Sequence, residues 1–167
     1  MNPDIFIGDL VDLPFSVSAV VNAANEDLAA GGGVCGAIFR AAGPGLQAAC
    51  DKVTPCPTGE ARITPAFKIN AEHIIHAVGP IFRDDSTEER ELLAAAYTSA
   101  LQLADDQGLE SIAFPAISTG IYGFPPEEAA PVVHAAITAF TPRNLKRCLL
   151  VYRSEESATP AREAAAK

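Results

Sequence analysis

The sequence predicts an α/β fold in which helices cover both faces of a largely parallel sheet. Short apolar runs that are typical of buried strands alternate along the chain with longer segments of helical character. One of these runs, at residues 73–78, is apolar on both faces, as expected of an inner strand. Proline, glycine and acidic residues stand where the helices should begin and end.

The first half of the chain combines strands with two short helices. Gly43 and Pro44 divide the helical part into two pieces, because proline does not continue a helix. The expected elements are strands at 4–8, 19–22 and 73–78, helices at 34–42 and 45–53, and an extended segment at 61–69.

The second half carries clearer helix boundaries. Ser86, followed by Thr87, Glu88 and Glu89, is typical of a helix start, and Gly108 is typical of a helix end. Two prolines and two glutamates at 125–128 open the next helix. The expected elements are helices at 86–107 and 125–140, strands at 111–114 and 149–152, and a terminal helix or frayed tail at 154–167.

Composition limits the function classes. A chain of 167 residues, nearly half of them apolar, suits one domain with a sizeable core. We find no apolar run of the ~18 residues that a membrane span needs and no signal-peptide pattern. We therefore expect a soluble, cytoplasmic protein. As a separate expectation, we take it to be a monomer. The net charge of −9 argues against broad nucleic-acid binding, which requires a basic face.

The cysteines and histidines do not suggest a metal site. Cys35, Cys50, Cys56 and Cys148 form no C-x-x-C pair and no Cys/His cluster of the zinc type. We expect free thiols, although the spacing alone also allows a Cys50–Cys56 disulfide. The histidines are interpreted as structural, since two of them lie three apart on one strand and face opposite sides; they are His73, His76 and His134.

The stretch VVNAANEDLAAGGGVCGAI at residues 20–38 is the most informative part of the chain. A β-branched pair predicts a strand, three glycines follow at 31–33, and a helical segment begins at Val34. Glycines let backbone N–H groups approach an anion closely, and a helix N-terminus adds partial positive charge. Strand, glycine loop and helix together favour a phosphate-binding loop, although a glycine-rich loop alone is also typical of a tight turn.

A second stretch, IAFPAISTGIYGFP at residues 112–125, has the same order of strand, loop and helix. The two stretches resemble the first and second ligand loops of the macrodomain family, in particular its MacroD-type branch. Weaker matches are IGDLVDL at 7–13, CPTGEARITPAF at 56–67 and HIIHAVGPIF at 73–82, and with them the resemblance extends to Tyr152.

The resemblance implies a three-layer α/β/α sandwich with a mixed, largely parallel sheet. It implies a macrodomain over residues 1–153, with residues 154–167 as a short C-terminal helix or tail of the same domain. The implied ligand is ADP-ribose, free or on mono-ADP-ribosylated macromolecules, and no cofactor, metal or membrane is implied. Residues 111–126 contain no charged side chain, so an anion there would be bound by backbone donors and helix ends.

Residue roles at the adenine end follow from the resemblance. Asp9 matches the aspartate that recognises the adenine amino group, and Leu10 would offer its backbone N–H to the ring. Asp after glycine is also ordinary turn chemistry. Tyr152 would stack on adenine, although an aromatic residue at a strand end is equally often simple packing.

The distal ribose, whose anomeric carbon carries the modification, is assigned to the first loop. Asn25 would bind its hydroxyls, since an amide can both donate and accept. Asn22 is a weaker candidate and is also consistent with a structural turn. Backbone contacts to this ribose and to the diphosphate are expected from Gly32, Gly33 and Val34.

The second loop should form the opposite wall of the site. Tyr122 would pack against the distal ribose and fix the anomeric centre. Ser-Thr-Gly is also a common turn sequence, but here it follows a strand and precedes a helix. The expected wall residues are Ser118, Thr119, Gly120, Ile121 and Tyr122.

Cys35 is the departure from the family pattern. MacroD-type hydrolases carry an aspartate here, which orients or activates water for attack on the anomeric carbon. A thiol with an ordinary pKa near ~8.5 is mostly neutral and a poor acceptor. Three interpretations follow: hydrolysis with water activated by the α-phosphate of the ligand, binding without turnover, or Cys35 as a nucleophile or redox-sensitive gate, which would need a positive neighbour that the sequence does not place there.

The function implied is an ADP-ribosyl hydrolase that removes ADP-ribose from modified acidic side chains or deacetylates O-acetyl-ADP-ribose. Asn25, Cys35 and Tyr122 are its candidate catalytic residues. The alternative is a non-catalytic ADP-ribose reader or sequestering module, which Cys35 favours. A general nucleotide-binding enzyme is disfavoured, because the P-loop and dinucleotide fingerprints are absent.

Overall fold

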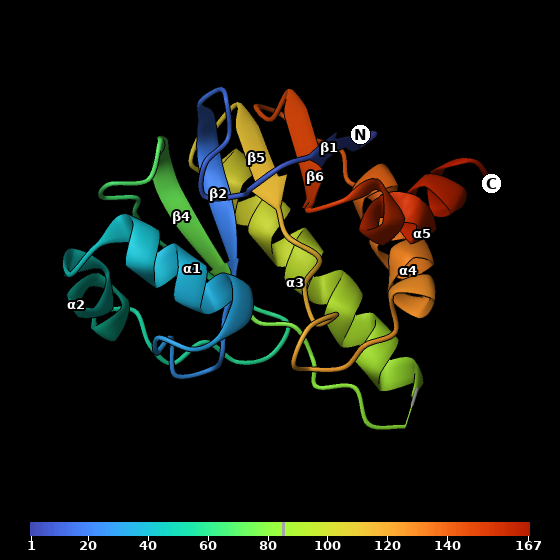
Figure 1. Ribbon diagram of the computed structural model, residues 1–167, viewed down its shortest axis with the longest axis horizontal. Coiled ribbons are helices and arrows are strands. Elements are labelled where there is room, and N and C mark those ends of the chain that lie inside the picture. The colour runs from blue at the N-terminus through green and yellow to red at the C-terminus, as the bar shows by residue number, and fades with distance from the viewer. Residues whose placement is uncertain (85) are drawn as a thin grey trace.

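The computed structural model describes residues 1–84 and 86–167, which form a six-stranded sheet between two layers of helices (Figure 1). The strand order is β1-β6-β5-β2-β4-β3. Strand β3 pairs antiparallel with β4, and the other neighbours are parallel. The strands are β1 (Asp4–Ile7), β2 (Val17–Ala23), β3 (Ala61–Pro65), β4 (Ala71–Ala77), β5 (Ser111–Phe114) and β6 (Arg147–Tyr152). The predicted mixed, largely parallel sheet is confirmed.

Helices cover both faces of this sheet. The helices are α1 (Gly33–Ala42), α2 (Gly45–Asp51), α3 (Thr87–Asp106), α4 (Pro126–Ala139) and α5 (Glu155–Ala165). Helices α1 and α2 pack on one face with Val20, Ile74 and Leu149, a set that we call the α1/α2 core. Helices α3 and α4 pack on the other face with Ile75 and Phe114, in the α3/α4 core.

The C-terminal segment 154–167, predicted as a short helix or tail, contains α5 (Glu155–Ala165), which begins with a capping box between Ser154 and Ser157. Helix α5 lies against α4 and β1 at the right of Figure 1. Three small residues make its packed side: Ala158, Ala161 and Ala164. Helix α5 therefore belongs to the same layer as α3 and α4.

Some predicted boundaries were wrong. The extended segment at 61–69 ends as a strand at Pro65, because the chain turns at Phe67, whose φ is 53°. Helix α2 ends at Asp51 rather than 53, shortly before Thr54 and Pro55, where proline restricts the preceding backbone. Strands β2 and β6 each begin two residues earlier than predicted, because pairing with β4 and β5 extends them.

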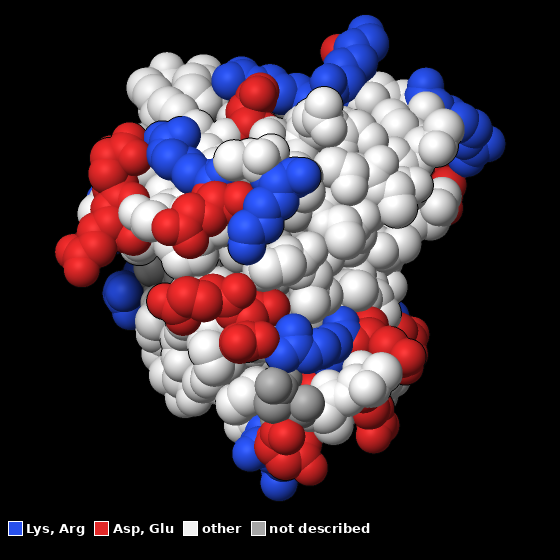
Figure 2. Space-filling view, turned by 90° about the vertical axis from the view of Figure 1, so that its right-hand side faces the viewer, with Lys and Arg blue, Asp and Glu red and all other residues white. Residues whose placement is uncertain are grey.

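The surface carries charges of both signs. Figure 2 shows the face that lies to the right in Figure 1, where acidic and basic side chains lie beside one another around an uncharged area. Ion pairs such as Arg162–Glu155 on α5, at 3.0 Å, contribute to this mixture. Among the helices that the structure describes, none is long and apolar enough to cross a membrane.

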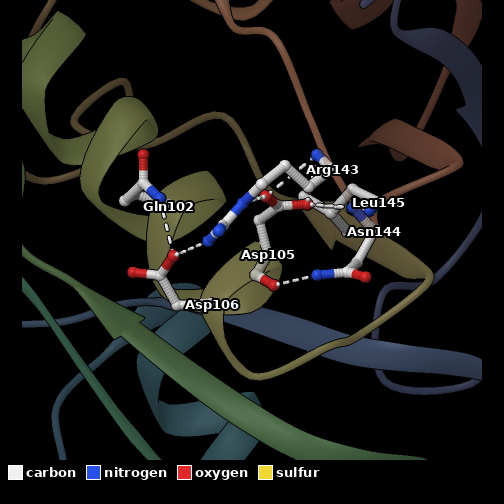
Figure 3. Close-up of polar contacts among 6 residues, drawn as sticks. All are labelled: Gln102, Asp105, Asp106, Arg143, Asn144 and Leu145. Carbon is white, nitrogen blue, oxygen red and sulfur yellow. Dashed lines mark hydrogen bonds and ion pairs between the residues drawn. The ribbon is translucent and has the colours of Figure 1, made fainter.

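Asp105, at the end of α3, fastens that helix to the loop before β6 (Figure 3). Its side chain is buried and accepts hydrogen bonds from three successive backbone N–H groups, at 2.9 Å from Leu145, 2.7 Å from Asn144 and 3.0 Å from Arg143. These bonds, led by that of Leu145, lower the pKa of Asp105 below its usual value.

We expect Asp105→Asn to lower the free energy of unfolding at pH 7, because an amide nitrogen would face backbone donors. A carboxyl with a lowered pKa stabilises the fold above its unfolded pKa of about 3.9 and loses that effect as pH falls through the folded value. The difference in free energy of unfolding between the wild type and Asp105→Asn, measured by urea titration, should therefore shrink from pH 7 toward pH 2. The control is the exposed neighbour, Asp106→Asn, and a deficit that is constant with pH would contradict this account.

Candidate functional site

A cavity of about 280 Å³ opens at the carboxyl ends of β2, β4 and β5. This is the edge where ligands bind in open α/β sheets. Its walls come from the loop and helix start after β2, the loop after β5, and Gly79 after β4. The lining residues are Ala23, Ala24, Asn25, Gly31, Gly32, Gly33, Val34, Cys35, Gly79, Ala116, Ile117, Ser118, Gly120, Ile121 and Tyr122.

The first wall of the cavity is the loop and helix start after β2, and the side chain of Asn25 holds this loop in shape. Its amide donates to the carbonyl of Ala29 at 2.9 Å and accepts from the N–H of Ala29 at 3.0 Å, which closes the loop on itself. Helix α1 then begins at Gly33 after Gly32, and within the described part of the chain no side chain caps it. Its first-turn N–H groups therefore remain available to a ligand.

The second wall of the cavity is the loop after β5, and Tyr97 of α3 holds it through two hydrogen bonds. Its buried hydroxyl donates to the carbonyl of Pro115 and accepts from the N–H of Ile117, each at 3.0 Å. Ser118 follows with φ of 68°, a backbone conformation that non-glycine residues rarely adopt and that is concentrated at functional sites. Its hydroxyl oxygen is buried and has no hydrogen-bond partner among the described residues, which is rare for a buried polar atom.

Gly79 lets the loop after β4 press against the second wall. A Cβ at this position would lie 2.2 Å from Oγ of Ser118 and 2.5 Å from Cγ2 of Ile117. A few residues on, the N–H of Phe82 donates to the carbonyl of Tyr122 at 2.8 Å. The two loops are therefore fixed to each other at both ends of the second wall.

Among the described residues that line the cavity, none has a charged side chain. The donors it offers are backbone N–H groups at a helix start and in a glycine-rich loop, which bind anions through partial charges. Gly32 and Ile121 meet across the opening, since a Cβ on Gly32 would be 3.4 Å from Cδ1 of Ile121, a side chain that is 83% exposed. The arrangement suits an elongated anion gripped from two sides.

Cys35 lines the cavity as a neutral thiol. Burial raises its pKa, and hydrogen bonds from Asn22 and from the backbone of Gly31 offset only part of this effect. Its sulfur donates to the carbonyl of Ala29 at 3.5 Å. A thiolate nucleophile is disfavoured by this environment.

Tyr122 lies between the cavity and a neighbouring groove that contains Glu26 and Thr58. Partial burial, with a smaller effect from Glu26, raises the pKa of its phenol. At neutral pH the phenol is therefore protonated and offers both an aromatic face and a donor.

The residues predicted for the adenine end lie outside this cavity. Asp9 follows β1 and accepts from the N–H of Val11 at 3.2 Å, while Arg153 approaches its carboxylate at 3.4 Å. Leu10 is buried in the α1/α2 core. Tyr152 packs against the α3/α4 core and, with Thr119, borders a small cavity of about 20 Å³ next to the main one.

Asn22 is buried beneath the cavity floor rather than on its surface, at 1% exposure. Its amide nitrogen lies 3.0 Å from Nδ1 of His76 and 3.8 Å from Sγ of Cys35. Burial lowers the pKa of His76 to about 4, so the ring is neutral at physiological pH. The four cysteines are free and buried, as expected.

Sequence reasoning missed several lining residues. Ala23, Ala24, Ala116 and Ile117 offer only backbone or small apolar groups, which leave little signal in a sequence. Gly79 did leave a signal in the sequence, because a Gly-Pro pair directly after an inner strand marks the carboxyl edge of the sheet, where ligand sites form.

These features define an α/β/α domain with an anion-binding cleft at the carboxyl edge of a mostly parallel sheet. The particular class is identified by sequence: the chain belongs to the Macro domain family, whose model matches residues 21–133. The chain is 48% identical over 164 residues to a Klebsiella pneumoniae protein named O-acetyl-ADP-ribose deacetylase, covering 95% of this chain and 93% of that protein. It is 50% identical over 140 residues to a Methanosarcina mazei Macro domain-containing protein, covering 84% and 74%.

Solved structures agree with this assignment. A mutant Oceanobacillus iheyensis macrodomain with ADPR superposes with a TM-score of 0.90 at 38% identity, covering 97% of this chain and 90% of that chain. A Trypanosoma brucei macrodomain in complex with ADP-ribose gives 0.84 at 33% identity, covering 96% and 68%.

We expect Gly79→Ala to destabilise the protein by about 1–3 kcal/mol, the usual cost of overpacking. The added methyl group must displace the side chains of Ser118 and Ile117, whose nearest atoms lie 2.2 Å and 2.5 Å from the new Cβ. Gly120→Ala is the matched control on the same cleft, since a Cβ there meets nothing within 4 Å. Urea unfolding measures both, and equal stability of the two variants would contradict the close-approach argument.

Proposed function

We propose that this protein binds ADP-ribose in the cavity and hydrolyses ADP-ribosyl groups from modified acidic side chains or deacetylates O-acetyl-ADP-ribose. The observation that carries the proposal is the uncharged cavity between two backbone-lined loops, one after β2 and one after β5. A diphosphate gripped by N–H groups from both sides fits such a cavity. The names of the Klebsiella pneumoniae relative and of the ligand-bound macrodomains support the same ligand.

The strand order gives the ligand a direction. Asn25, Cys35 and Tyr122 surround the end of the cavity next to β2, where we place the distal ribose. Asp9 follows β1, three strands away from β2, which corresponds to roughly 14 Å at the usual strand spacing. An elongated ligand that spans this distance brings its adenine near Asp9, Leu10 and Tyr152, with Gly32, Gly33, Val34 and residues 118–121 along its diphosphate.

Turnover in this site uses a water molecule without a carboxylate at position 35. Water attacks the anomeric carbon and gives its proton to the α-phosphate of the ligand, while the bond from that carbon to the modified side chain breaks and the side chain leaves as a carboxylate. Asn25 and the two loops hold the anomeric centre in place. Tyr122 packs against the distal ribose and limits its motion. A missing general base costs on the order of 10²–10⁴ in rate, so we expect a slow enzyme.

The alternative is a reader that binds ADP-ribose without turnover, and the neutral thiol of Cys35 favours it. Both proposals use the same binding residues, so only turnover separates them. The further assignments that we propose are the MacroD-type branch, a domain of residues 1–153 with 154–167 as its terminal helix, a monomeric state, a cytoplasmic location, and mono-ADP-ribosylated macromolecules as partners.

The first test is a time course of ADP-ribose release from a protein that carries mono-ADP-ribose on glutamate. Enzyme-free and Asn25→Ala samples are the controls. Release above both controls supports the hydrolase. Absence of release by a folded protein that still binds ADP-ribose supports the reader.

We expect Cys35→Asp to raise turnover on the order of 10²-fold, because a carboxylate with a pKa near ~4 is a charged acceptor for water. Affinity for ADP-ribose should change by less than about threefold, since the backbone contacts stay in place. Cys35→Ser is the size-matched control and should stay near the wild-type rate. A flat or lower rate for Cys35→Asp would show that the site uses different chemistry.

Asn25→Ala and Asp9→Ala should affect opposite ends of the ligand. We expect Asn25→Ala to lower turnover more than affinity, and Asp9→Ala to weaken ADP-ribose binding about tenfold through loss of a charge-assisted hydrogen bond. Calorimetry and the release assay measure the two effects, with the exposed Asp12→Ala as control. Unchanged affinity in Asp9→Ala would mean that the assigned ligand orientation is wrong.

A further inference from the structure

A chain of buried polar groups runs from the cavity into the α1/α2 side of the sheet. It starts at Cys35 in the cavity wall and continues through Asn22 of β2 to His76 of β4, the residue directly opposite in the strand register. It ends at Thr64 of β3, whose Oγ1 lies 2.9 Å from Nε2 of His76. His76 is fully buried and does not line the cavity.

The donors and acceptors fix the direction of this chain. An amide nitrogen only donates, so Nδ1 of His76 must accept from Asn22 and the ring proton must sit on Nε2. Nε2–H then donates to Thr64, whose hydroxyl donates in turn to the carbonyl of Pro65 at 3.2 Å. Sγ of Cys50 lies 3.7 Å from the same ring nitrogen and is a second neighbour of its proton. The lowered pKa of His76 agrees with a neutral ring that has one accepting nitrogen.

The orientation of the Asn22 amide depends on His76. Its oxygen is buried and has no partner among the described residues, so no donor holds that end of the amide. The bond to His76 therefore selects the orientation in which N–H, rather than C=O, faces Sγ of Cys35. An N–H there stabilises negative charge at position 35, whereas a C=O would repel it.

The chain of polar groups is also connected to Asn25, through Cys35 and Ala29. The sulfur of Cys35 donates to the carbonyl of Ala29, the residue that Asn25 also bonds through its side chain. A change in the Asn22 amide therefore acts on both cavity residues that we place beside the distal ribose.

We propose that His76 is a positioning residue: its Nδ1 lone pair orients the Asn22 amide so that an N–H group holds the side chain at position 35 in the cavity wall. Its effect on turnover rests on the proposed function, but its effect on the Cys35 thiol does not.

The wild-type protein provides the first test. Nitrogen NMR of the imidazole should show the tautomer with its proton on Nε2 and Nδ1 unprotonated. A proton on Nδ1 would overturn the proposal, whatever the protein does to ADP-ribose.

Two variants at position 76 provide the second test. In His76→Asn the side-chain oxygen replaces Nδ1 as the acceptor, whereas His76→Leu removes the acceptor, and both variants lose Nε2. We expect His76→Leu to slow alkylation of Cys35 by iodoacetamide about fivefold, the scale of one hydrogen bond, and His76→Asn to keep the wild-type rate. Peptide mass spectrometry assigns the modified cysteine, and Cys148 in the α3/α4 core is the internal reference.

Thermal melting and ADP-ribose binding confirm that each variant is folded. Equal Cys35 alkylation rates in folded His76→Asn and His76→Leu would overturn the proposal. If either variant does not fold, the tautomer measurement on the wild type decides alone. In the release assay, kcat should fall in His76→Leu, with recovery in His76→Asn and unchanged ADP-ribose affinity. A wild-type protein without turnover would count against the hydrolase and leave the thiol measurement intact.

Discussion

The close approach of Gly79 to the side chains of Ser118 and Ile117 is the constraint on which the cleft depends. A single missing methyl group brings the loop after β4 within packing distance of the loop after β5. The bond from Phe82 to Tyr122 and the two bonds of Tyr97 then fix the second loop from its other sides. These attachments hold Ser118 in its unusual backbone conformation, and a preformed wall reduces the ordering that a ligand must impose.

The cleft accepts an anion in a protein with a net charge of −9 because charge is excluded from it locally. Helix ends and loop N–H groups supply partial positive charge without a lysine or arginine. The polar groups beneath the floor follow the same rule, since His76 is neutral and Cys35 is a buried thiol. Within the cavity, every strong charge would then be brought by the ligand, and the backbone dipoles would orient it.

The sequence was sufficient for most of the fold and for the two cleft loops, because strand periodicity, helix caps and glycine loops are local signals. It was insufficient where partners come from distant segments. The pairing of Asn22 with His76 needs the β2–β4 register, and the support from Tyr97 needs the packing of α3. Phe67 shows the same limit at a boundary, since nothing local in its neighbours announces a left-handed turn.

The two walls of the cleft are anchored in different cores. Leu28 and Ile38 tie the first wall to the α1/α2 core, whereas Ile117 and Phe124 tie the second to the α3/α4 core. A ligand that fills the cleft therefore bridges the two helix layers. At a free ligand concentration of about a hundred times Kd, binding adds about 2.7 kcal/mol to the free energy of unfolding. Ligand would then slow degradation of the protein by cellular proteases, so that the amount of protein in the cell would rise and fall with the concentration of ligand.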